Sequence, residues 1–552
     1  MPQPNIIVVL IDDMGVRDLG CTGSTFYETP HIDRLAAGGV NLTQAYAASS
    51  LCSPARAAIL TGRAPARVGI TNYIPGNGSG RLRGPAYHHA LPRSERTLPT
   101  ALHEGGYHTW HVGKWHLGGE GSLPTDHGFE VNLGGDHHGG LYHIPGVYFA
   151  PWVGRDGATL PGLEHAEPGE YMTDRLTSEA IRLIRGKSDE RPFFLHLSHY
   201  AVHTPIVSPP DLVQRYEAKS QRLGLDQVPA LVAGELHPAL HLLGQRVQRR
   251  LLQSHTGYAA MVHNLDANVG RLLAALDDCG QADNTLIVFL SDNGGLSVGV
   301  EGSVTCTLPY REGKGWAEEG GVRIPLLMRW PARLPGGRAL ATPMWQCDLY
   351  PTLLEAAGLP MEPERHLDGI SMLGALAGAA PHAARSLAAP AVADEPADRG
   401  CRQTMGLSSG QCPAPAANSA RDRQPPHATS QADAPDGSDG PIPEPREMCW
   451  HYPHYSNQGG GPTGAIRRGH WKLIEHYETG KCQLFDLAND ISESFDLALA
   501  RPDLAADLAE RLRAWRQEVG ASMPETNPFY EDVVAGRRPK PDGNGNYPPA
   551  KG

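Results

Sequence analysis

Short apolar segments alternate, through the first two thirds of the chain, with longer segments of helical periodicity. Residues 5–11, NIIVVLI, are apolar almost throughout, and 108–112, 192–198 and 285–291 are similar in character. Such segments predict strands that are buried on both faces of a sheet. A later strand is expected within 323–330.

Two of the intervening segments carry apolar residues at helical spacing. In 171–187 these occupy positions 176, 180, 181, 183 and 184, and in about 246–278 they include Leu265, Val269, Leu272, Leu273 and Leu276. The alternation of strands and helices predicts an α/β fold, with a large mixed, mostly parallel sheet flanked by helices.

The composition changes after residue 380. Residues 381–446 are rich in Ala, Pro, Ser, Asp and Gln and have few large apolar side chains, so we expect a disordered insertion there. In 447–552, strand-like segments around a turn and a helix at about 502–519 predict a smaller C-terminal α+β subdomain with an antiparallel sheet. The large domain is then 1–380.

Charge and cysteine content exclude several classes of protein. A formal net charge of -12 over 552 residues argues against a nucleic-acid partner. The nine cysteines lack CxxC spacing, which predicts neither a disulfide framework nor a zinc site. No apolar run has membrane-spanning length, and the N-terminus predicts a first strand rather than a signal peptide. We expect a cytoplasmic protein as the chain is given, and a periplasmic or secreted one if the N-terminus is truncated.

Acidic and amide side chains follow two of the predicted strands. Asp12 and Asp13 come directly after 5–11, and Asp292 and Asn293 come directly after 285–291. Ligands of open α/β sheets bind beyond the carboxyl ends of the strands, so we expect these side chains to share one site. Their oxygens are hard ligands that suit Ca²⁺ or Mg²⁺ better than zinc.

Cations and imidazoles are placed in the same way. Lys114 and His116 follow the strand at 108–112, and His203 follows the strand at 192–198. Together with Arg56 and a divalent ion, they predict a pocket for an anion with several oxygens, such as sulfate or phosphate.

The segment 49–63, SSLCSPARAAILTGR, predicts a short helix. We expect Ser53 as its N-cap, Pro54 at its first position and Gly62 at its end. Cys52 would lie just before the helix N-terminus, where the dipole favours negative charge. It could be a buried packing residue or a low-pKa thiolate nucleophile, although a soft sulfur beside a hard-cation site is a poor match.

The same segment resembles a family signature. CSPARAAILTGR is similar to the first signature of the type I sulfatases, C-x-P-x-R followed by T-G, and GYHTWHVGKWHLG at 106–118 is similar to the second. The resemblance runs from Asn5 to about Pro331 and returns in the C-terminal strands and the turn that follows them. It implies a formylglycine-dependent, arylsulfatase A-like enzyme of the alkaline phosphatase superfamily, with 1–380 as its catalytic domain.

In that family the signature cysteine is oxidised to formylglycine by a maturing enzyme, which would be a transient partner of this chain. The resemblance implies that a hydroxyl of the hydrated aldehyde at position 52 attacks the sulfur of a sulfate ester. Arg56 would hold this diol, and His116 would take a proton from its second hydroxyl. A hemiacetal sulfate can then collapse by elimination.

The remaining roles also come from the resemblance. Lys114 and Lys314 would bind the sulfate oxygens, and His203 would protonate the leaving alcohol or hold the sulfate. One Ca²⁺ ion would be ligated by an oxygen of modified residue 52 or of the sulfate and by four side chains: Asp12, Asp13, Asp292 and Asn293. Glu312 stands where relatives often carry glycine, which bears on the shape of the Lys314 loop.

The substrate is expected to be a sulfated carbohydrate. Three segments rich in His, Tyr, Asn and Gly, at 68–76, 134–146 and 451–461, suit a hydroxyl-rich sugar. The expected pocket rim consists of His137, His451 and His454. Two alternatives stay open: a formylglycine-dependent phosphonate monoester or phosphodiester hydrolase, and a non-catalytic protein that binds sulfated glycans with Cys52 unconverted.

Overall fold

Five parallel strands form the centre of the largest sheet in the computed structural model, which describes residues 3–76, 78–300, 302–378, 446–543 and 545–547. They run in the order β10 (Thr285–Ser291), β1 (Asn5–Ile11), β7 (Phe193–Ser198), β5 (His108–Gly113) and β6 (Val131–Leu133). Beyond β10 lie β12 (Leu326–Arg329) and β2 (Val40–Leu42), each antiparallel to the strand before it, and then β13 (Arg338–Leu340), parallel to β2. The prediction of a mixed, mostly parallel sheet is confirmed.

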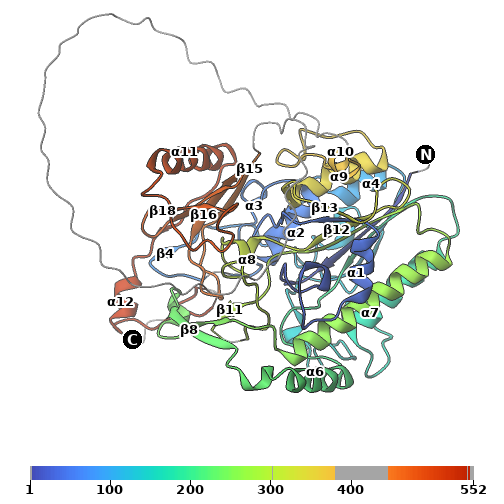
Figure 1. Ribbon diagram of the computed structural model, residues 1–552, viewed down its shortest axis with the longest axis horizontal. Helices are drawn as coiled ribbons and strands as arrows, with labels where there is room; N and C mark the ends of the chain where they lie inside the picture. The colour runs from blue at the N-terminus through green and yellow to red at the C-terminus, as the bar shows by residue number, and fades with distance from the viewer. Residues whose placement is uncertain (1–2, 77, 301, 379–445, 544, 548–552) are drawn as a thin grey trace, which may run out of the picture. The chain divides into compact units, whose positions relative to one another are not determined.

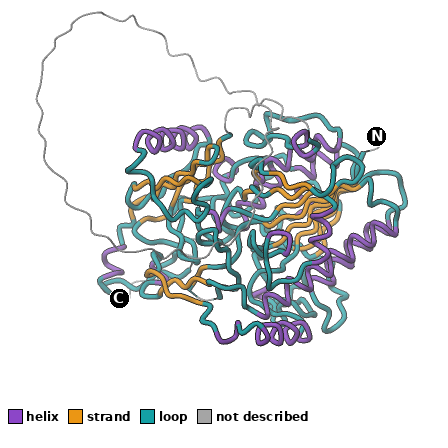
Figure 2. The backbone as a smooth tube through the Cα atoms, viewed as in Figure 1, coloured by secondary structure: helices purple, strands orange, loops and turns teal. Residues whose placement is uncertain are grey.

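Helices cover both faces of this sheet (Figures 1 and 2). The alternating side chains of β1 show why: Ile7, Val9 and Ile11 pack with α1 (Pro30–Ala37), α5 (Met172–Gly186) and α7 (Thr256–Asp278). On the opposite face Ile6, Val8 and Leu10 pack with α2 (Cys52–Thr61), α4 (Leu98–Glu104) and α9 (Leu349–Ala357). A strand buried on both faces is therefore apolar at every position.

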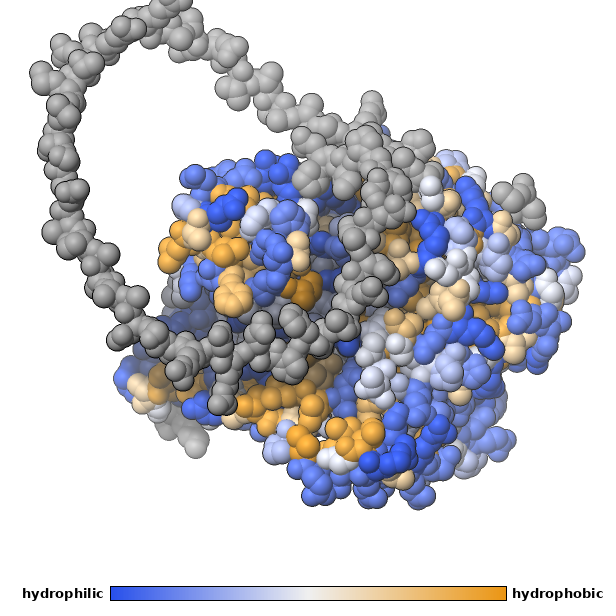
Figure 3. Space-filling view, in the orientation of Figure 1, coloured by the Kyte–Doolittle hydropathy of each residue, from blue (hydrophilic) through white to orange (hydrophobic). Residues whose placement is uncertain are grey.

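One element boundary differs from the expectation. Residues Arg246–Arg250 form a strand, β9, between β8 (Leu231–Leu236) and β11 (Val298–Gly299), and α7 begins only at Thr256. In RVQRR, Val247 is fully buried between more exposed polar neighbours, which is the alternation of a strand. β8 carries exposed apolar side chains, which lie in the apolar patch at its position in Figure 3.

The C-terminal part is an antiparallel sheet with one helix, as predicted. Its strands β15 (Glu447–Tyr452), β16 (Thr463–Arg468), β17 (Trp471–His476) and β18 (Lys481–Asp486) pair in chain order, and α11 (Pro502–Glu518) packs on one face. The other face packs on the large domain through Trp450, Ile474 and Phe485. Buried Lys472 adds an ion pair to Glu319 at 3.0 Å, so the two parts share a core and a charge pair.

The remaining elements are one helix of 13 residues and several short segments. They are β3 (Ala45–Tyr46), α3 (Pro65–Val68), β4 (Leu82–Arg83), α6 (Pro210–Arg222), α8 (Glu319–Val322), β14 (Met344–Trp345), α10 (Leu373–Leu376), β19 (Glu525–Thr526) and α12 (Tyr530–Val534), with short 3-10 turns between them. Among the described helices, none has both the length and the apolarity needed to cross a bilayer. The predicted insertion at 381–446 lies outside the described residues except for Arg446, so the three-part division stays a prediction.

Candidate active site

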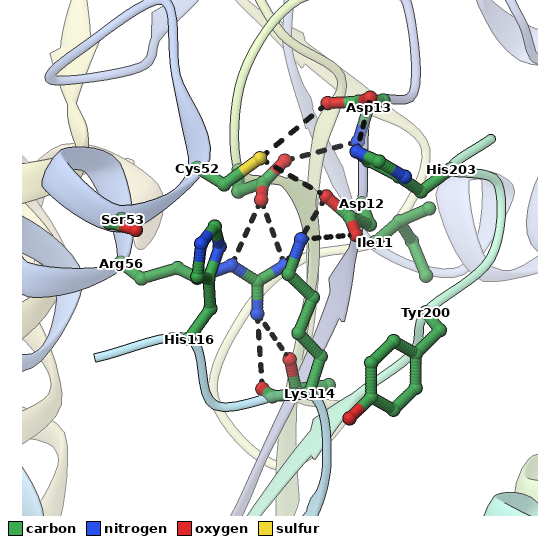
Figure 4. Close-up of polar contacts among 12 residues, drawn as sticks. Ile11, Asp12, Asp13, Cys52, Ser53, Arg56, Lys114, His116, Tyr200 and His203 are labelled. Atoms are coloured by element: carbon green, nitrogen blue, oxygen red, sulfur yellow. Dashed lines mark hydrogen bonds and ion pairs between the residues drawn. The ribbon is translucent and has the colours of Figure 1, made fainter. Parts of the chain in front are cut away.

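Four oxygen-bearing side chains meet at the carboxyl ends of β1 and β10. Asp12 and Asp13 follow β1, Asp292 and Asn293 follow β10, and the parallel register pairs Ile11 with Ser291 just before them. All four are fully buried or nearly so. Cys52 reaches the same point from α2, with its Sγ 3.5 Å from Asp12 Oδ1 and 3.8 Å from Asp13 Oδ1 (Figure 4).

The donor set fits a hard divalent cation. Asn293 donates its amide NH₂ to Asp13 Oδ1 at 2.8 Å, while its own Oδ1 is buried and has no hydrogen-bond partner among the described residues. Burial raises the pKa of Asp12 to about 7, and Asp292 and Asp13 act in the same direction against Lys114. Buried carboxylates and an unused amide oxygen are the ligands that Ca²⁺ or Mg²⁺ prefers.

The helix begins two residues earlier than expected, so Cys52 lies inside it rather than before it. α2 begins at Cys52 itself, and Leu51 occupies the N-cap position without a side-chain cap. Ser53 is not the cap because its hydroxyl accepts a hydrogen bond from Ile74 N at 3.0 Å and so holds the neighbouring loop. Gly62 ends the helix in the left-handed region, at φ 67°, as predicted.

The thiol of Cys52 is not activated as a nucleophile. Burial raises its pKa well above the usual value, and Asp292 and Asp12 add to this effect although Lys114 and Lys314 oppose it. A thiol in this state carries little thiolate at neutral pH. The structure therefore disfavours the low-pKa thiolate interpretation.

Arg56 is buried beneath the carboxylates. Its Nε and Nη2 donate to Asp292 Oδ2 at 3.0 and 2.8 Å, and its Nη1 donates to Ser198 Oγ at 2.7 Å and to the Lys114 carbonyl at 3.1 Å. These bonds fix the first turn of α2 to β10, β7 and the loop after β5, which holds residue 52 in place.

Two lysines complete the charge balance. Lys114 Nζ lies 2.5 Å from Asp12 Oδ2, and Lys314 Nζ lies 2.6 Å from Asp13 Oδ2. With Arg56 the site has three cations against three carboxylates. A divalent cation held by the carboxylates would leave two net positive charges, which suits a doubly charged anion such as released sulfate.

The two histidines present basic nitrogens to the site. His203 Nδ1 is 2.6 Å from the Thr204 carbonyl, which can only accept, so Nδ1 carries the proton and Nε2 accepts from Lys314 Nζ at 3.0 Å. His116 Nε2 donates to the Ile74 carbonyl at 2.6 Å, which leaves Nδ1 buried and without a partner in the described part of the chain. Burial, followed by Lys314, lowers the pKa of His203 to about 3, so this ring is neutral at pH 7.

A cavity of about 390 Å³ opens onto these groups. Cys52, His116, His203 and Lys314 line its reactive part. The remaining wall carries six side chains able to contact a bound alcohol: Tyr73, His138, Tyr142, His143, Asn457 and Gln458. All six lie in the three segments that the sequence indicates for the substrate, although the predicted rim residues are different ones.

The expected rim needs correction. His451 is buried in β15, with its ring nitrogens 2.8 Å from Tyr477 Oη and 3.0 Å from the Ser522 carbonyl. His454 is fully buried, with Nε2 2.8 Å from Thr71 Oγ1. Neither lines the cavity, because both pack between the C-terminal sheet and its neighbours. His137 is exposed and lies beside the lining residue His138, with ring centroids 3.8 Å apart.

Comparison with known proteins assigns the family. The model of the Sulfatase family matches residues 4–359. N-acetylgalactosamine-6-sulfatase of Canis lupus familiaris is 33% identical over 403 residues, which cover 68% of this chain and 67% of that protein. Steryl-sulfatase of Homo sapiens is 32% identical over 449 residues, with 68% and 70% covered.

A solved structure extends the likeness to nearly the whole chain. Ps i-CgsB in complex with k-i-k-neocarrahexaose superposes with a TM-score of 0.65 at 25% identity and 97% coverage of both chains. Its fold is shared from the parallel sheet to the C-terminal antiparallel sheet. The chain therefore belongs to the sulfatase family and is a sulfuric ester hydrolase.

Proposed function

We propose that this chain hydrolyses the sulfate ester of a saccharide, with Ca²⁺ at Asp12, Asp13, Asp292 and Asn293 and with Cys52 oxidised to formylglycine. The observation that carries this proposal is the position of Cys52. Its Sγ is within 4 Å of two carboxylates of the cation site and also lines the cavity. The raised pKa of its thiol supports conversion of the side chain rather than direct use of the sulfur.

When present, a hydrated aldehyde at position 52 would supply a hydroxyl nucleophile, and the divalent cation would supply counter-charge. The chain's own groups do the rest. Lys314, which lines the cavity, and Lys114, which is buried beside Asp12, stabilise the negative charge of the sulfate oxygens. Arg56 keeps residue 52 oriented through its bonds to Asp292 and Ser198.

His116 is the base of the proposed mechanism. Its Nε2–H bond to Ile74 fixes the tautomer, so the unpartnered Nδ1 is available to accept a proton from a hydroxyl at position 52. A base must have its lone pair free at working pH, and burial, followed by Lys114, lowers the pKa of His116 well below its usual value.

Lys314 and His203 are the groups that would interact with the leaving alcohol. His203 is neutral in the free protein, whereas Lys314 is protonated and donates to His203 Nε2 at 3.0 Å. Against the effect of burial, Asp13 raises the pKa of Lys314 well above its ordinary value, so Lys314 keeps its proton and its charge for the sulfate oxygens. His203 can protonate the leaving oxygen only after it has bound a proton, which the negative charge of the bound sulfate ester would favour.

The cavity wall supports a saccharide as the alcohol. Tyr73 and Tyr142 offer ring faces and hydroxyls, and Asn457 offers amide groups, all of which suit a sugar with many hydroxyls. Two similar proteins agree with this choice in their names, N-acetylgalactosamine-6-sulfatase and the carrahexaose complex of Ps i-CgsB.

Mass spectrometry and kinetics test the proposal together. Protein made with a maturing enzyme should give a residue-52 peptide about 18 Da lighter than the cysteine form. It should cleave sulfate esters with a higher kcat/KM than matched phosphate monoesters and diesters, and chelation of Ca²⁺ should abolish turnover. Cys52→Ala should fold and be inactive. Full activity in that variant, or in chelator-treated protein, would refute the mechanism.

A further inference from the structure

A second cluster of metal-ligating side chains lies beside the cavity. It comes from the segment DHHGGLYH, residues 136–143, which follows β6 and supplies part of the cavity wall. Asp136, His137 and His138 each offer a ligand atom, and these atoms lie within 4.8 Å of one another. None of the three takes part in the proposed reaction.

The imidazoles of this cluster are unusually close. The ring centroids of His137 and His138 are 3.8 Å apart, and those of His138 and His143 are 3.5 Å apart with an angle of 9° between the rings. Asp136 contacts the central ring, with Oδ2 2.7 Å from His138 Nδ1. The other oxygen of this carboxylate, Oδ1, accepts a hydrogen bond from His138 N at 2.8 Å, so Asp136 fixes the orientation of His138.

An unsatisfied atom lies beside the cluster. His143 Nδ1 is buried and has no hydrogen-bond partner among the residues that the structure describes. Buried polar atoms are rarely left without a partner, so a bound polar group is expected next to this atom. Because its ring is stacked on that of His138, His143 is a neighbour of the three ligating groups rather than a fourth ligand. Entry is open, because Asp136 and His138 keep 16% and 28% of their side-chain surface exposed and His137 lies at the surface.

We propose that Asp136, His137 and His138, with His143 beside them, form a second metal site that takes a zinc-like divalent ion. Imidazole nitrogens with one carboxylate suit Zn²⁺ and its neighbours in the first transition row. The Asp12 cluster offers oxygens from carboxylates and an amide, which suit Ca²⁺. The two sites thus select different ions, and neither needs the other to be filled.

The position of this site gives it a consequence for substrate binding. His138 and His143 also line the cavity, and the Asp136 carbonyl accepts a hydrogen bond from His116 N at 3.0 Å. Three protein ligands leave a tetrahedral ion with an open position. An ion here places a fixed positive charge at the edge of the space for the leaving alcohol.

Co²⁺ binding to the full-length, Ca²⁺-saturated protein tests this site. Co²⁺ is the probe because its visible absorption reports a low-symmetry nitrogen and oxygen environment. We expect equilibrium dialysis to count one Co²⁺ per chain that Zn²⁺ displaces and excess Ca²⁺ does not. His137→Ala and Asp136→Asn should each weaken binding at least tenfold.

The matched control is another adjacent histidine pair, His88 and His89, which are exposed and belong to no ligating group found in the described chain. His88→Ala and His89→Ala should leave Co²⁺ binding unchanged. Displacement of Co²⁺ by Ca²⁺ would show that the ion had occupied the Asp12 cluster and would overturn the proposal. Unchanged binding in His137→Ala would overturn it as well, and this exposed residue can be removed without a folding defect.

Discussion

Single histidines in this protein serve different ends, and burial alone does not distinguish them. His116 is nearly fully buried and lines the cavity, and its Nδ1 has no hydrogen-bond partner among the described residues. His454 is fully buried too, yet its Nε2 bonds to Thr71 and its ring packs against Tyr87. His454 is therefore a packing residue, and its effect on the stability of the protein depends on pH.

His454 should make the protein sensitive to acid. Burial lowers the pKa of this imidazole from 6.5 to about 3. Below about pH 6.5 the unfolded chain takes up a proton that the folded protein refuses, so stability is lost as the pH falls towards 3. His454→Gln keeps a group that can bond to Thr71 and removes this loss. Urea unfolding at pH 7 and pH 5 should show a decrease in stability smaller by about 2 kcal/mol in the variant than in the wild type. An equal decrease in both proteins would contradict the assignment.

Glu312 is a second residue whose role depends on its setting. Its backbone has φ 58°, a region that glycine occupies more readily. Its buried carboxylate binds Arg249 through two bonds of 2.8 and 2.9 Å. The ion pair with β9 thus holds a strained position two residues before Lys314.

Arg249→Met should leave that carboxylate with only the longer contact to Arg311, at 3.7 Å, and disturb the Lys314 loop. We expect a loss of about 1–3 kcal/mol in stability, the cost of a buried unpaired group, together with a lower kcat/KM. Adding Glu312→Gly should recover most of both, because glycine accepts φ 58° and leaves no carboxylate to pair. Thermal melting and steady-state kinetics of the single and double variants provide the measurement. A double variant as impaired as the single one would show that Arg249 acts through Glu235 instead.

At the scale of elements, the segment 136–143 is positioned by a close approach to a catalytic ring. A Cβ at Gly139 would lie 2.4 Å from His116 Cε1 and 2.5 Å from His116 Nε2. The bond from His116 Nε2 to Ile74 leaves this ring no room to retreat. Glycine is required here for space rather than for backbone angle.

Gly139→Ala should therefore reduce kcat at least tenfold, since His116 must shift, and should also lower the melting temperature, since the ring has no free space to move into. Gly186→Ala, at the end of α5, is the control, because a Cβ there has open space. Comparison of kcat and melting curves for the two variants decides the point. Wild-type turnover in Gly139→Ala would show that His116 is not held as described.

The strands show how much of the fold the sequence can predict. β1 and β10 were predictable because each is apolar over a whole strand and ends in polar residues, and their parallel pairing brings those residues together. The sequence predicts the start of a helix where β9 lies, because its single buried residue, Val247, fits either period over five residues. The structure of a short segment depends on the strands with which it pairs, and the residues of the segment itself do not show which strands these are.

Site residues follow the same rule. The cation site comes from residues adjacent to strand ends, so topology alone places them. His454 was misplaced because its burial depends on Thr71, 383 residues away in the chain. The sequence indicates which segments form the cavity wall. It does not indicate which side chains of those loops face the cavity, because packing decides this.

On the scale of the whole molecule, the cavity is assembled from distant parts of the chain. Asn457, in the turn after β15, donates its amide to Tyr73 Oη at 3.0 Å and lies 3.0 Å through Oδ1 from His241 Nε2. The C-terminal subdomain thereby supplies part of the cavity wall. On the proposed function it would contribute to substrate choice and take no part in breaking the S–O bond.

Asn457→Ala should raise KM for a saccharide sulfate by up to about tenfold, the value of one lost hydrogen bond, and leave kcat unchanged. A small aryl sulfate does not reach this wall and should be cleaved with an unaltered KM. Asn489→Ala, whose amide bonds to Asp486 in its own turn, is the matched control. Equal effects on both substrates would show a general structural defect instead.

The burial of Cys52 limits when this residue can be oxidised. In the folded protein only 2% of this residue is exposed, and the helix that begins with it is buried along its whole length. The maturing enzyme must bind the segment 52–56 in its own active site. The folded protein does not allow this, because the segment is buried. On the proposed mechanism, oxidation therefore competes with folding, and each chain has one interval in which to be converted. The fraction of active enzyme in a preparation then depends on how long that segment stayed unfolded during synthesis.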